Sequence, residues 1–341
     1  MTTRILLGAD GLTEAAQILM NGGVAAFPTE TVYGLGADAT NPTAVARIFQ
    51  AKGRPSDNPL IVHIAQLDEW ALLASDINEQ ALTLAKRFWP GPLTIVLPRT
   101  NAVPDIVTAG LTTVGVRMPA HPLALALIRQ TGRPLAAPSA NHSGRPSPTT
   151  ARDVLADLDG CIPLILDGGA CSVGVESTVL DLSRNPPVLL RPGGVTIEEL
   201  REYLPNIVID PASLSPMEID TVPSSPGMKY RHYAPNIPLT VVIGECQVST
   251  LARLYDETLS KGSVPILLLS EETAALLAPR RCITIGSYND PAQLAGSLFS
   301  ALRSLDEHGA TAAFAESFPT DGVGLALMNR LLRAAGFKTI G

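Results

Sequence analysis

Short apolar runs alternate with amphipathic helical patterns along most of this 341-residue chain, and that alternation restricts the fold to the α/β class. Before residue 205 the predicted strands are 24–27, 60–64, 93–97, 114–118, 134–138, 163–167, 177–182 and 187–191. The predicted helices lie near residues 12–20, 42–50, 78–88, 122–131, 149–155 and 197–203. We therefore expect a first domain, residues 1–205, built on a sheet with flanking helices.

A cleaner alternation of strands and helices begins at residue 239. Strands are predicted at 239–243, 264–269, 282–285 and 311–315, with helices starting at Val248 and Glu271 and spanning 291–305 and 322–335. Four such units predict a small parallel sheet with helical crossovers, a Rossmann-like topology, over 239–341. Residues 206–238 are rich in Pro, Ser and Met and are predicted to be a linker. The end of this linker, SPGMKYRHYAP, carries more cations and tyrosines than a passive spacer requires.

Composition and charge exclude several classes of protein. With a formal net charge of −7, the chain lacks the broad basic surface that binding to a nucleic-acid backbone requires, although a local basic cleft remains open. An aromatic content of 4% argues against a surface that stacks bases. The four cysteines form no CxxC pair and have no zinc-spaced histidine, so we expect buried thiols in a reducing compartment. Without an apolar run near the roughly 20 residues of a membrane span, or a signal-like start, the expected location is the cytoplasm.

The common catalytic signatures are missing. The sequence contains no GxxxxGK[ST], no HExxH and no GxSxG. Residues 34–39 fit a relaxed GxGxxA, but six residues separate this segment from the preceding predicted strand, where a dinucleotide fingerprint would follow directly. These absences leave the candidate chemistry to polar residues in loops.

Two cations stand close together in the loop AKGRPSDNP. Lys52 and Arg54 suit phosphate oxygens, the first as a point charge and the second as a planar fork, but a solvated surface pair would have the same sequence. Other polar side chains follow or close predicted strands, namely Thr29 with Glu30 and Thr31, Arg117, Ser139, Asn141 and Arg191. Because ligands gather outside the carboxyl ends of strands, we expect these residues to line one crevice.

Each of these residues also has a purely structural interpretation. Thr29, Ser139 and Asn141 are common turn formers, and a single arginine is more often part of a structural ion pair. His63, inside an apolar run, is more often a buried core histidine than a catalyst. Cys171 is a weak candidate for a nucleophile because no base can be identified for it. Their joint occurrence after strands is what favours a site.

Several segments together resemble the threonylcarbamoyl-AMP synthase family in its two-domain form, with a YrdC-type catalytic domain followed by a Rossmann-like domain. The matching segments are FPTETVYGLGADA, KGRPSDNPLIVHI, FWPGPLTIVL, VGVRMPAHP, AAPSANHSGRPSPT, DGG followed by GVESTVLDL, LLRPG and the linker SPGMKYRHYAP. They occur in the family's order and spacing and cover most of residues 15–200 and the linker. The resemblance implies a twisted mixed sheet with an open crevice and a smaller parallel α/β domain.

The resemblance implies a nucleotidyltransferase that condenses L-threonine, bicarbonate and ATP to threonylcarbamoyl-adenylate and pyrophosphate, with Mg²⁺ held mainly by the phosphates. The product would pass to the machinery that forms threonylcarbamoyladenosine in tRNA. A chemistry of positioning and charge neutralisation needs no covalent nucleophile.

The resemblance also implies roles for individual residues. The family's Lys-Arg-Ser-Asn set falls on Lys52, Arg54, Ser139 and Asn141. The implied threonine pocket is Thr29, His63, Arg117 and Ser177, and the implied additional nucleotide contacts are Asn58, Thr113, Ser147 and Arg191, with Tyr230 of the linker as a lid. Two other functions stay open, namely a double-stranded RNA or tRNA-binding module without turnover, and a hydrolase or acyltransferase using Ser139 or Cys171.

Overall fold

The computed structural model describes residues 2–213, 215, 226 and 232–341. Contacts divide these residues into two compact units. The first contains residues 2–143 and 147–213 with Pro226, and the second contains residues 144–146, 215 and 232–341.

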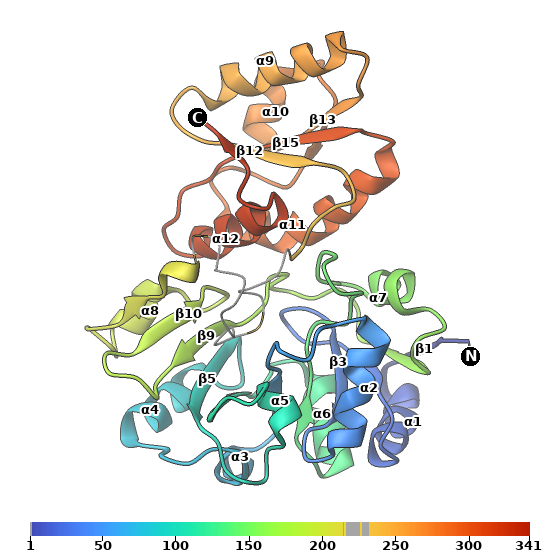
Figure 1. The fold of residues 1–341 in the computed structure, drawn as a ribbon, viewed down its shortest axis with the longest axis vertical. Coiled ribbons are helices and arrows are strands. Elements are labelled where there is room, and N and C mark those ends of the chain that lie inside the picture. The colour runs from blue at the N-terminus through green and yellow to red at the C-terminus, as the bar shows by residue number, and fades with distance from the viewer. Residues whose placement is uncertain (1, 214, 216–225, 227–231) are drawn as a thin grey trace. The chain divides into compact units, whose positions relative to one another are not determined.

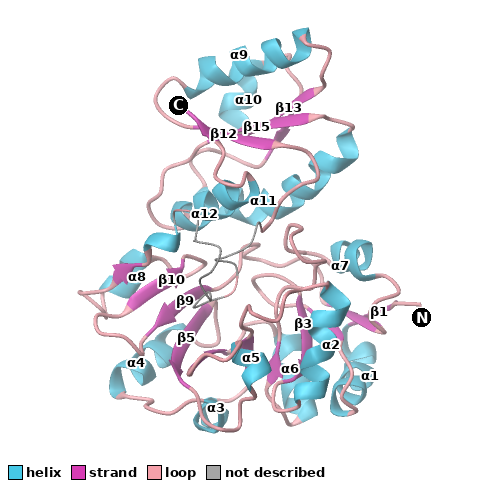
Figure 2. Cartoon of the chain, viewed as in Figure 1, coloured by secondary structure: helices cyan, strands magenta, loops and turns pink. Residues whose placement is uncertain are grey.

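The first unit is built on an 11-stranded sheet with the strand order β1-β8-β2-β3-β7-β4-β6-β5-β9-β10-β11. The strands are β1 (Arg4–Leu7), β2 (Ala25–Phe27), β3 (Gly34–Asp38), β4 (Ile61–His63), β5 (Leu93–Pro98), β6 (Thr113–Arg117), β7 (Leu135–Ala136), β8 (Leu164–Asp167), β9 (Thr178–Asp181), β10 (Val188–Arg191) and β11 (Val208–Ile209). The helices are α1 (Gly8–Met20), α2 (Pro42–Lys52), α3 (Trp70–Leu73), α4 (Glu79–Phe88), α5 (Asp105–Thr108), α6 (Pro122–Thr131), α7 (Ala151–Leu158) and α8 (Ile197–Arg201). They flank the sheet, as Figures 1 and 2 show.

Helix α2 carries Lys52 to its position, and its sequence explains where it begins and ends. The Asn41 side chain accepts hydrogen bonds from the Thr43 and Ala44 amides, and Pro42 follows with its φ already suited to a first helical turn. Gly53 ends the helix in the left-handed conformation, with φ 60°. Buried Val45 and Ile48 anchor the inner face, so Lys52 ends the helix pointing inward.

The sheet mixes parallel and antiparallel pairs, and this changes where strand ends meet. Strand β4 runs parallel to β6, which places His63 in register with Arg117. Strand β7 runs antiparallel to both β3 and β4. The carboxyl end of β7 therefore lies beside the beginning of β3, where Gly34 bridges Ser139, and away from His63. The candidate residues do not share one edge of the sheet, contrary to the argument from strand ends.

Strand β3 was not predicted, because its sequence, GLGAD, has the composition of a turn. Packing explains the glycine at position 36. A Cβ there would lie 2.7 Å from Cε1 of Phe27, a fully buried ring on the neighbouring strand. Glycine therefore lets the Phe27 ring pack against the strand, and β3 joins β2 to β7.

The second unit is a five-stranded sheet in the order β14-β13-β15-β12-β16, and every pairing in it is parallel. The strands are β12 (Leu239–Val242), β13 (Pro265–Leu269), β14 (Cys282–Thr284), β15 (Ala312–Glu316) and β16 (Thr339–Ile340), and the helices are α9 (Gln247–Ser260), α10 (Glu271–Leu277), α11 (Pro291–Ser304) and α12 (Gly324–Ala334). Helices α9 and α10 lie on one face of this sheet and α11 and α12 on the other (Figure 1). This is the Rossmann-like arrangement expected from the sequence.

The predicted fold class is confirmed, and the differences lie in short elements. Strands β1, β11 and β16 were not predicted, since two to four residues carry too little periodicity. Strand β11 lies within the predicted linker and pairs with β10, so the first unit's sheet extends past residue 205. Among the described residues, no helix combines the length and apolarity that crossing a membrane requires.

Burial of His63 predicts a pH dependence of stability. Burial, and then the charge of Arg117, lowers the pKa of His63 from 6.5 to about 3. Below pH 6.5 the His63 imidazole is protonated in the unfolded chain, whereas in the folded chain it stays neutral down to about pH 3. The free energy of unfolding therefore falls as the pH falls through this range. The loss is roughly 1.4 kcal/mol per pH unit below 6.5.

Urea unfolding at pH 7 and pH 5, followed by tryptophan fluorescence, measures this loss in the first unit, where Trp70 and Trp89 pack together. Between pH 7 and pH 5, the free energy of unfolding of His63→Gln is expected to fall by roughly 2 kcal/mol less than that of the wild type. His142→Gln, at an exposed position, is the matched control. Equal pH dependence in all three proteins would contradict the prediction.

Candidate active site

Lys52 is buried, with 1% of its surface exposed, which rules out the solvated surface pair for this residue. Its Nζ lies 2.5 Å from the carbonyl oxygen of Ser139, 2.5 Å from that of Asn141 and 3.2 Å from Asn141 Oδ1. An ammonium group has three N–H donors, and three protein oxygens surround this one. Lys52 therefore orders the 139–141 turn and places a positive charge beneath it.

The 139–141 turn is also held from within. Ser139 Oγ donates to Asn141 Oδ1 at 2.5 Å, and Asn141 Nδ2 donates to the His142 carbonyl at 2.8 Å. Arg54 follows Gly53 and is half-buried, and its Nη2 is 3.4 Å from the Pro59 carbonyl, a long contact. The structure thus joins Lys52, Ser139 and Asn141 in one network and places Arg54 in the adjoining loop.

A second network surrounds the turn after β2. Thr29 Oγ1 donates to the Val32 carbonyl at 2.6 Å and lies 2.8 Å from Thr31 Oγ1. Arg117, at the end of β6, donates from Nη1 to Thr31 Oγ1 at 2.9 Å and from Nε to the Gly91 carbonyl at 3.2 Å. Thr29 and Arg117 are therefore brought together through Thr31.

Arg117 also forms a buried ion pair with Glu30. Arg117 Nη2 lies 2.6 Å from Glu30 Oε1, and both side chains are more than nine-tenths buried. The pair lacks hydrogen-bond geometry, so Nη2 and both carboxylate oxygens are buried without a hydrogen bond. Charge alone joins these two groups, and their hydrogen-bonding capacity is unused.

A third network joins β5, β9 and β10. The Arg191 guanidinium donates to the Ser177 carbonyl from Nε at 3.1 Å and from Nη2 at 2.9 Å, and Nη2 also lies 3.2 Å from Ser177 Oγ. Ser177 Oγ in turn lies 2.8 Å from Thr94 Oγ1. The predicted pair Ser177 and Arg191 is thus in direct contact. Nearby in sequence, Ser147 Oγ donates to Glu176 Oε1 at 2.5 Å.

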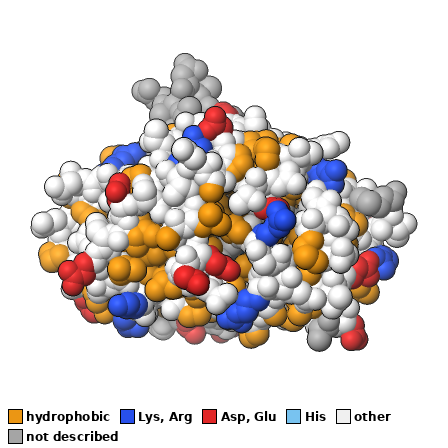
Figure 3. Space-filling view, turned by 90° about the horizontal axis from the view of Figure 1, so that it is seen from below, with side chains coloured by type: hydrophobic (Ala, Val, Ile, Leu, Met, Phe, Trp, Pro, Cys, Tyr) orange, Lys and Arg blue, Asp and Glu red, His pale blue; other side chains and the backbone are white. Residues whose placement is uncertain are grey.

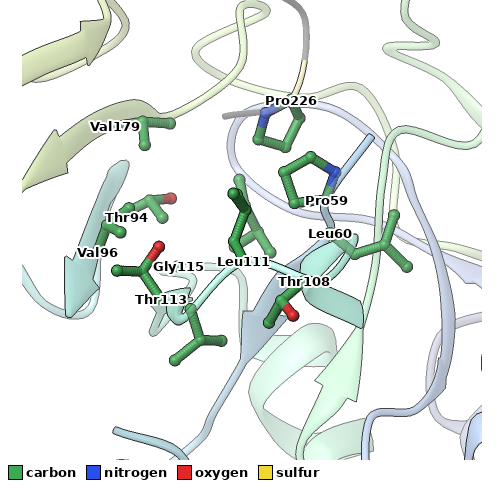
Figure 4. Close-up of a pocket in the computed structure, with 12 residues that line it drawn as sticks. Pro59, Leu60, Thr94, Val96, Thr108, Leu111, Thr113, Gly115, Val179 and Pro226 are labelled. Atoms are coloured by element: carbon green, nitrogen blue, oxygen red, sulfur yellow. The ribbon is translucent and has the colours of Figure 1, made fainter. Parts of the chain in front are cut away.

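A small pocket adjoins the third network (Figure 4). Thr94 and Val96 of β5, Thr113 of β6 and Pro59 line it, and Pro226, whose carbonyl accepts from Arg191 Nη1 at 3.2 Å, lies at its rim. Asn58, next to Pro59, is 1% exposed, and neither atom of its amide has a hydrogen-bond partner. The pocket wall thus combines apolar side chains with threonine hydroxyls, and the residue that precedes Pro59 carries an unused amide.

The segment 29–34 connects these groups through its backbone. The Ala140 amide donates to the Tyr33 carbonyl at 2.8 Å, and the Tyr33 amide donates to the Pro148 carbonyl at 2.9 Å. The Val173 amide donates to the Glu30 carbonyl at 2.7 Å. One short segment therefore fixes the loops that carry Ser139, Asn141, Ser147 and Ser177 relative to Arg117.

The geometry argues against the two nucleophiles considered from the sequence. Burial raises the pKa of the Cys171 thiol to about 12, so it stays protonated at neutral pH. Ser139 Oγ donates to an amide oxygen, which is too weak a base to activate it. Neither residue has the arrangement of a hydrolase or acyltransferase.

Most predicted site residues fall into these networks or beside the pocket. Thr113 lines the pocket, and Asn58 directly precedes Pro59, which also lines it. His63 lies next to Arg117, edge-on to the Phe27 ring. Tyr230 lies outside the described residues, so its lid role stays a prediction. Sequence reasoning singled out Glu30 beside Thr29 but gave it no role, and it missed Glu176 and Thr94 as site residues. The signal for the two glutamates was a carboxylate next to hydroxyl residues, in PTET and VEST.

No group of three or more His, Cys, Asp or Glu residues among those described could hold a metal ion. The two carboxylates in the networks already have partners, Glu30 with Arg117 and Glu176 with Ser147. On the face of the molecule in Figure 3, basic and acidic side chains alternate with hydrophobic ones and form no continuous basic stripe. That face does not resemble a surface for a nucleic-acid backbone.

Both parts of the chain match known protein families. Residues 17–193 match the family described as telomere recombination, and residues 195–336 match the C-terminal domain of threonylcarbamoyl-AMP synthase. The threonylcarbamoyl-AMP synthase of Bacillus subtilis is 50% identical over 330 residues, which cover 96% of this chain and 94% of the relative. That of Pyrococcus abyssi is 48% identical over 335 residues, covering 96% and 94%.

Solved structures give the same result. The crystal structure of P. abyssi Sua5 complexed with L-threonine matches with a TM-score of 0.93 and 45% identity, and the match covers 100% of this chain and 99% of that one. E. coli YciO matches 57% of this chain and 96% of its own, with a TM-score of 0.51 and 25% identity. The chain belongs to the threonylcarbamoyl-AMP synthase family, in its two-domain form.

Proposed function

We propose that this chain condenses L-threonine, bicarbonate and ATP to threonylcarbamoyl-AMP and pyrophosphate. The observation that carries the proposal is the set of three polar networks joined through segment 29–34 within the unit that matches the family. The crystal structure of the P. abyssi relative is a complex with L-threonine, and its similarity extends over the whole chain. This supports threonine as the amino-acid substrate.

The threonine pocket is proposed around Arg117. Its guanidinium suits the substrate carboxylate, and Nη2 has no hydrogen bond of its own. Thr29 and Ser177 supply hydroxyls, and His63, whose pKa is lowered to about 3, stays neutral and adds no competing charge. These groups bind a zwitterion of small size without a nucleophile.

The nucleotide is proposed to bind between the pocket and the 139–141 turn. The pocket beside Thr113 combines apolar side chains with threonine hydroxyls, a lining that suits an adenine base. The Asn58 amide, next in sequence to Pro59 of this pocket, offers an unused donor and acceptor. The charges of Lys52, Arg54 and Arg191 favour phosphate oxygens. In-line attack of the carbamate on the α-phosphorus then depends on positioning.

Mg²⁺ is proposed to be bound mainly by the substrate phosphates and water, since the described residues offer no set of protein carboxylates for it. It would neutralise charge on the triphosphate. The linker, with Tyr230, is proposed as a lid over the nucleotide, and tRNA-modifying enzymes as the recipients of the product. The proposed location is the cytoplasm, which four free cysteines suit.

Pyrophosphate release measured across the amino acids, with and without bicarbonate, tests the proposed reaction. We expect release with threonine plus bicarbonate and, without either, less than about one-tenth of that rate, because the carbamate is the nucleophile. Equal release with bicarbonate omitted would contradict the proposal.

Lys52→Met tests the buried ammonium. Loss of the charge and of the contacts that order the 139–141 turn is expected to lower the rate of pyrophosphate release by roughly 10²-fold or more. Arg47→Met is the matched control, because Arg47 lies on the same helix but is exposed and, among the described residues, donates to the Gly22 carbonyl. Rates within threefold of each other in the two variants would argue against a role for Lys52.

Asn58→Ala is expected to have opposite effects on stability and on ATP binding. The Asn58 amide is buried without partners, so its removal relieves a desolvation cost and leaves the melting temperature unchanged or higher. If ATP uses the amide, the dissociation constant for ATP rises by about 10-fold, as expected for a hydrogen bond in a closed site. Calorimetric binding and thermal melting of the same sample measure both effects. A lower melting temperature with unchanged ATP affinity would assign Asn58 to the fold.

A further inference from the structure

Glu30 is a buried carboxylate whose hydrogen-bonding capacity is unused. Only 8% of the residue is exposed, and neither Oε1 nor Oε2 has a hydrogen-bond partner. The nearby positive charge is Arg117, with Nη2 at 2.6 Å from Oε1. A buried charge without hydrogen bonds costs stability, so its presence in the turn after β2 calls for an explanation.

Arg117 does not need Glu30 to hold its position. Its Nη1 is bound by Thr31 Oγ1 at 2.9 Å and its Nε by the Gly91 carbonyl at 3.2 Å, so two of its three nitrogens are already fixed. The third, Nη2, and the Glu30 carboxylate lie side by side with no hydrogen bonds. An unused cationic donor beside an unused anionic acceptor complements the two charges of an amino acid.

We propose that Glu30 binds the α-ammonium group of the amino-acid substrate and accepts the proton that this group releases when the carbamate forms. The proposal rests on the proposed function, in which the substrate amine captures bicarbonate. With the substrate carboxylate on Arg117, the substrate ammonium lies within reach of the Glu30 carboxylate, which is 2.6 Å from Arg117 Nη2.

The proton balance of carbamate formation requires such an acceptor. An ammonium ion and bicarbonate give a carbamate, water and one proton. The nitrogen first gives a proton to a carboxylate oxygen of Glu30, and its lone pair then forms the bond to the carbonate carbon. The C–O bond breaks, and the leaving hydroxide combines with the second nitrogen proton as water. No electrons are exchanged with any other group, and Glu30 returns its proton to solvent.

Two other titratable groups lie close enough for the charge of Glu30 to act on them, and neither suits the role. The Cys171 thiol stays protonated because burial raises its pKa to about 12. His121 Nδ1 already accepts the Leu123 amide as the cap of α6, and burial lowers the pKa of His121. Among the described residues facing this position, Glu30 is the anionic acceptor.

A binding cycle tests the contact with the ammonium group. The ligands are L-threonine and 2,3-dihydroxybutanoate of matching configuration, in which a hydroxyl replaces the ammonium. We expect the wild type to prefer threonine by about 10-fold or more, and Glu30→Gln by less than about 3-fold, because a charge-assisted hydrogen bond becomes a neutral one. A purely structural defect would weaken both ligands equally and leave the ratio unchanged.

Asp38→Asn is the matched control. Asp38 is also a buried carboxylate paired with an arginine, at 2.7 Å from Arg133 Nη1, but it lies at the far end of β3. The Asp38→Asn variant is expected to prefer threonine over the dihydroxy acid by the same factor as the wild type. Loss of the preference in Asp38→Asn as well would overturn the assignment to Glu30.

Turnover tests the proton transfer. At saturating threonine, bicarbonate and ATP, Glu30→Gln is expected to lose roughly 10²–10³-fold in kcat, the usual contribution of a positioned base. Glu30→Asp keeps the charge, so it retains the threonine preference and turns over faster than Glu30→Gln. If Glu30→Gln does not fold by thermal melting, Glu30→Asp carries the test against the wild type.

The outcomes separate the two proposals. A wild type without threonine-dependent pyrophosphate release overturns the proposed function. A wild type that turns over, with a Glu30→Gln variant that keeps the 10-fold threonine preference or a kcat within 3-fold, overturns the role of Glu30 and leaves the proposed function standing.

Discussion

The buried pair of Arg117 and Glu30 joins the two parts of the sheet on which the site depends. Arg117 ends β6, and Glu30 lies in the turn between β2 and β3. The same turn hydrogen-bonds through its backbone to the loops after β7 and β8. The backbone of this turn thus connects the pair to the loops that carry Ser139 and Val173. Breaking such a pair by removing one partner leaves an uncompensated buried charge, a cost of about 3–5 kcal/mol.

Lys52 shows a related use of a buried charge. A lysine that binds phosphate is expected to expose its ammonium group to solvent. Here the ammonium of Lys52 is instead enclosed by the carbonyls of Ser139 and Asn141. Three oxygens satisfy its donors, so its charge is retained in the interior at a small cost. These contacts hold the turn in place, so an anion bound there lies close to the ammonium charge. Positioning and electrostatics, which adenylyl transfer requires, come from the same side chain.

The sequence predicted the long periodic elements and most of the residues that line the site. It could not predict β3, because two glycines in five residues are typical of a turn. The reason for Gly34 and Gly36, the close packing of the Phe27 ring, is visible only in the structure. It also could not predict the relation between strand ends. Ser139 follows one predicted strand and His63 lies near the end of another, but β7 runs antiparallel to β4, and register across a mixed sheet is set by long-range pairing. Glu30 was visible beside Thr29, but its importance depends on a contact 87 residues away in sequence, which no local pattern encodes.

Glu30 and Arg117 differ from the other buried polar groups in how they are paired. Native proteins leave few buried polar atoms without a hydrogen bond, because each one costs about 1–3 kcal/mol. Among the described residues such atoms occur in both units, for example on Trp70 in the first and on Glu316 in the second, so their distribution alone does not identify a site. At Glu30 and Arg117, however, an anionic acceptor, Oε1, and a cationic donor, Nη2, lie 2.6 Å apart and neither atom makes a hydrogen bond. A site that must bind a zwitterion needs a donor and an acceptor that the fold has not already used, and the desolvation cost of this pair is recovered when the ligand supplies the missing partners.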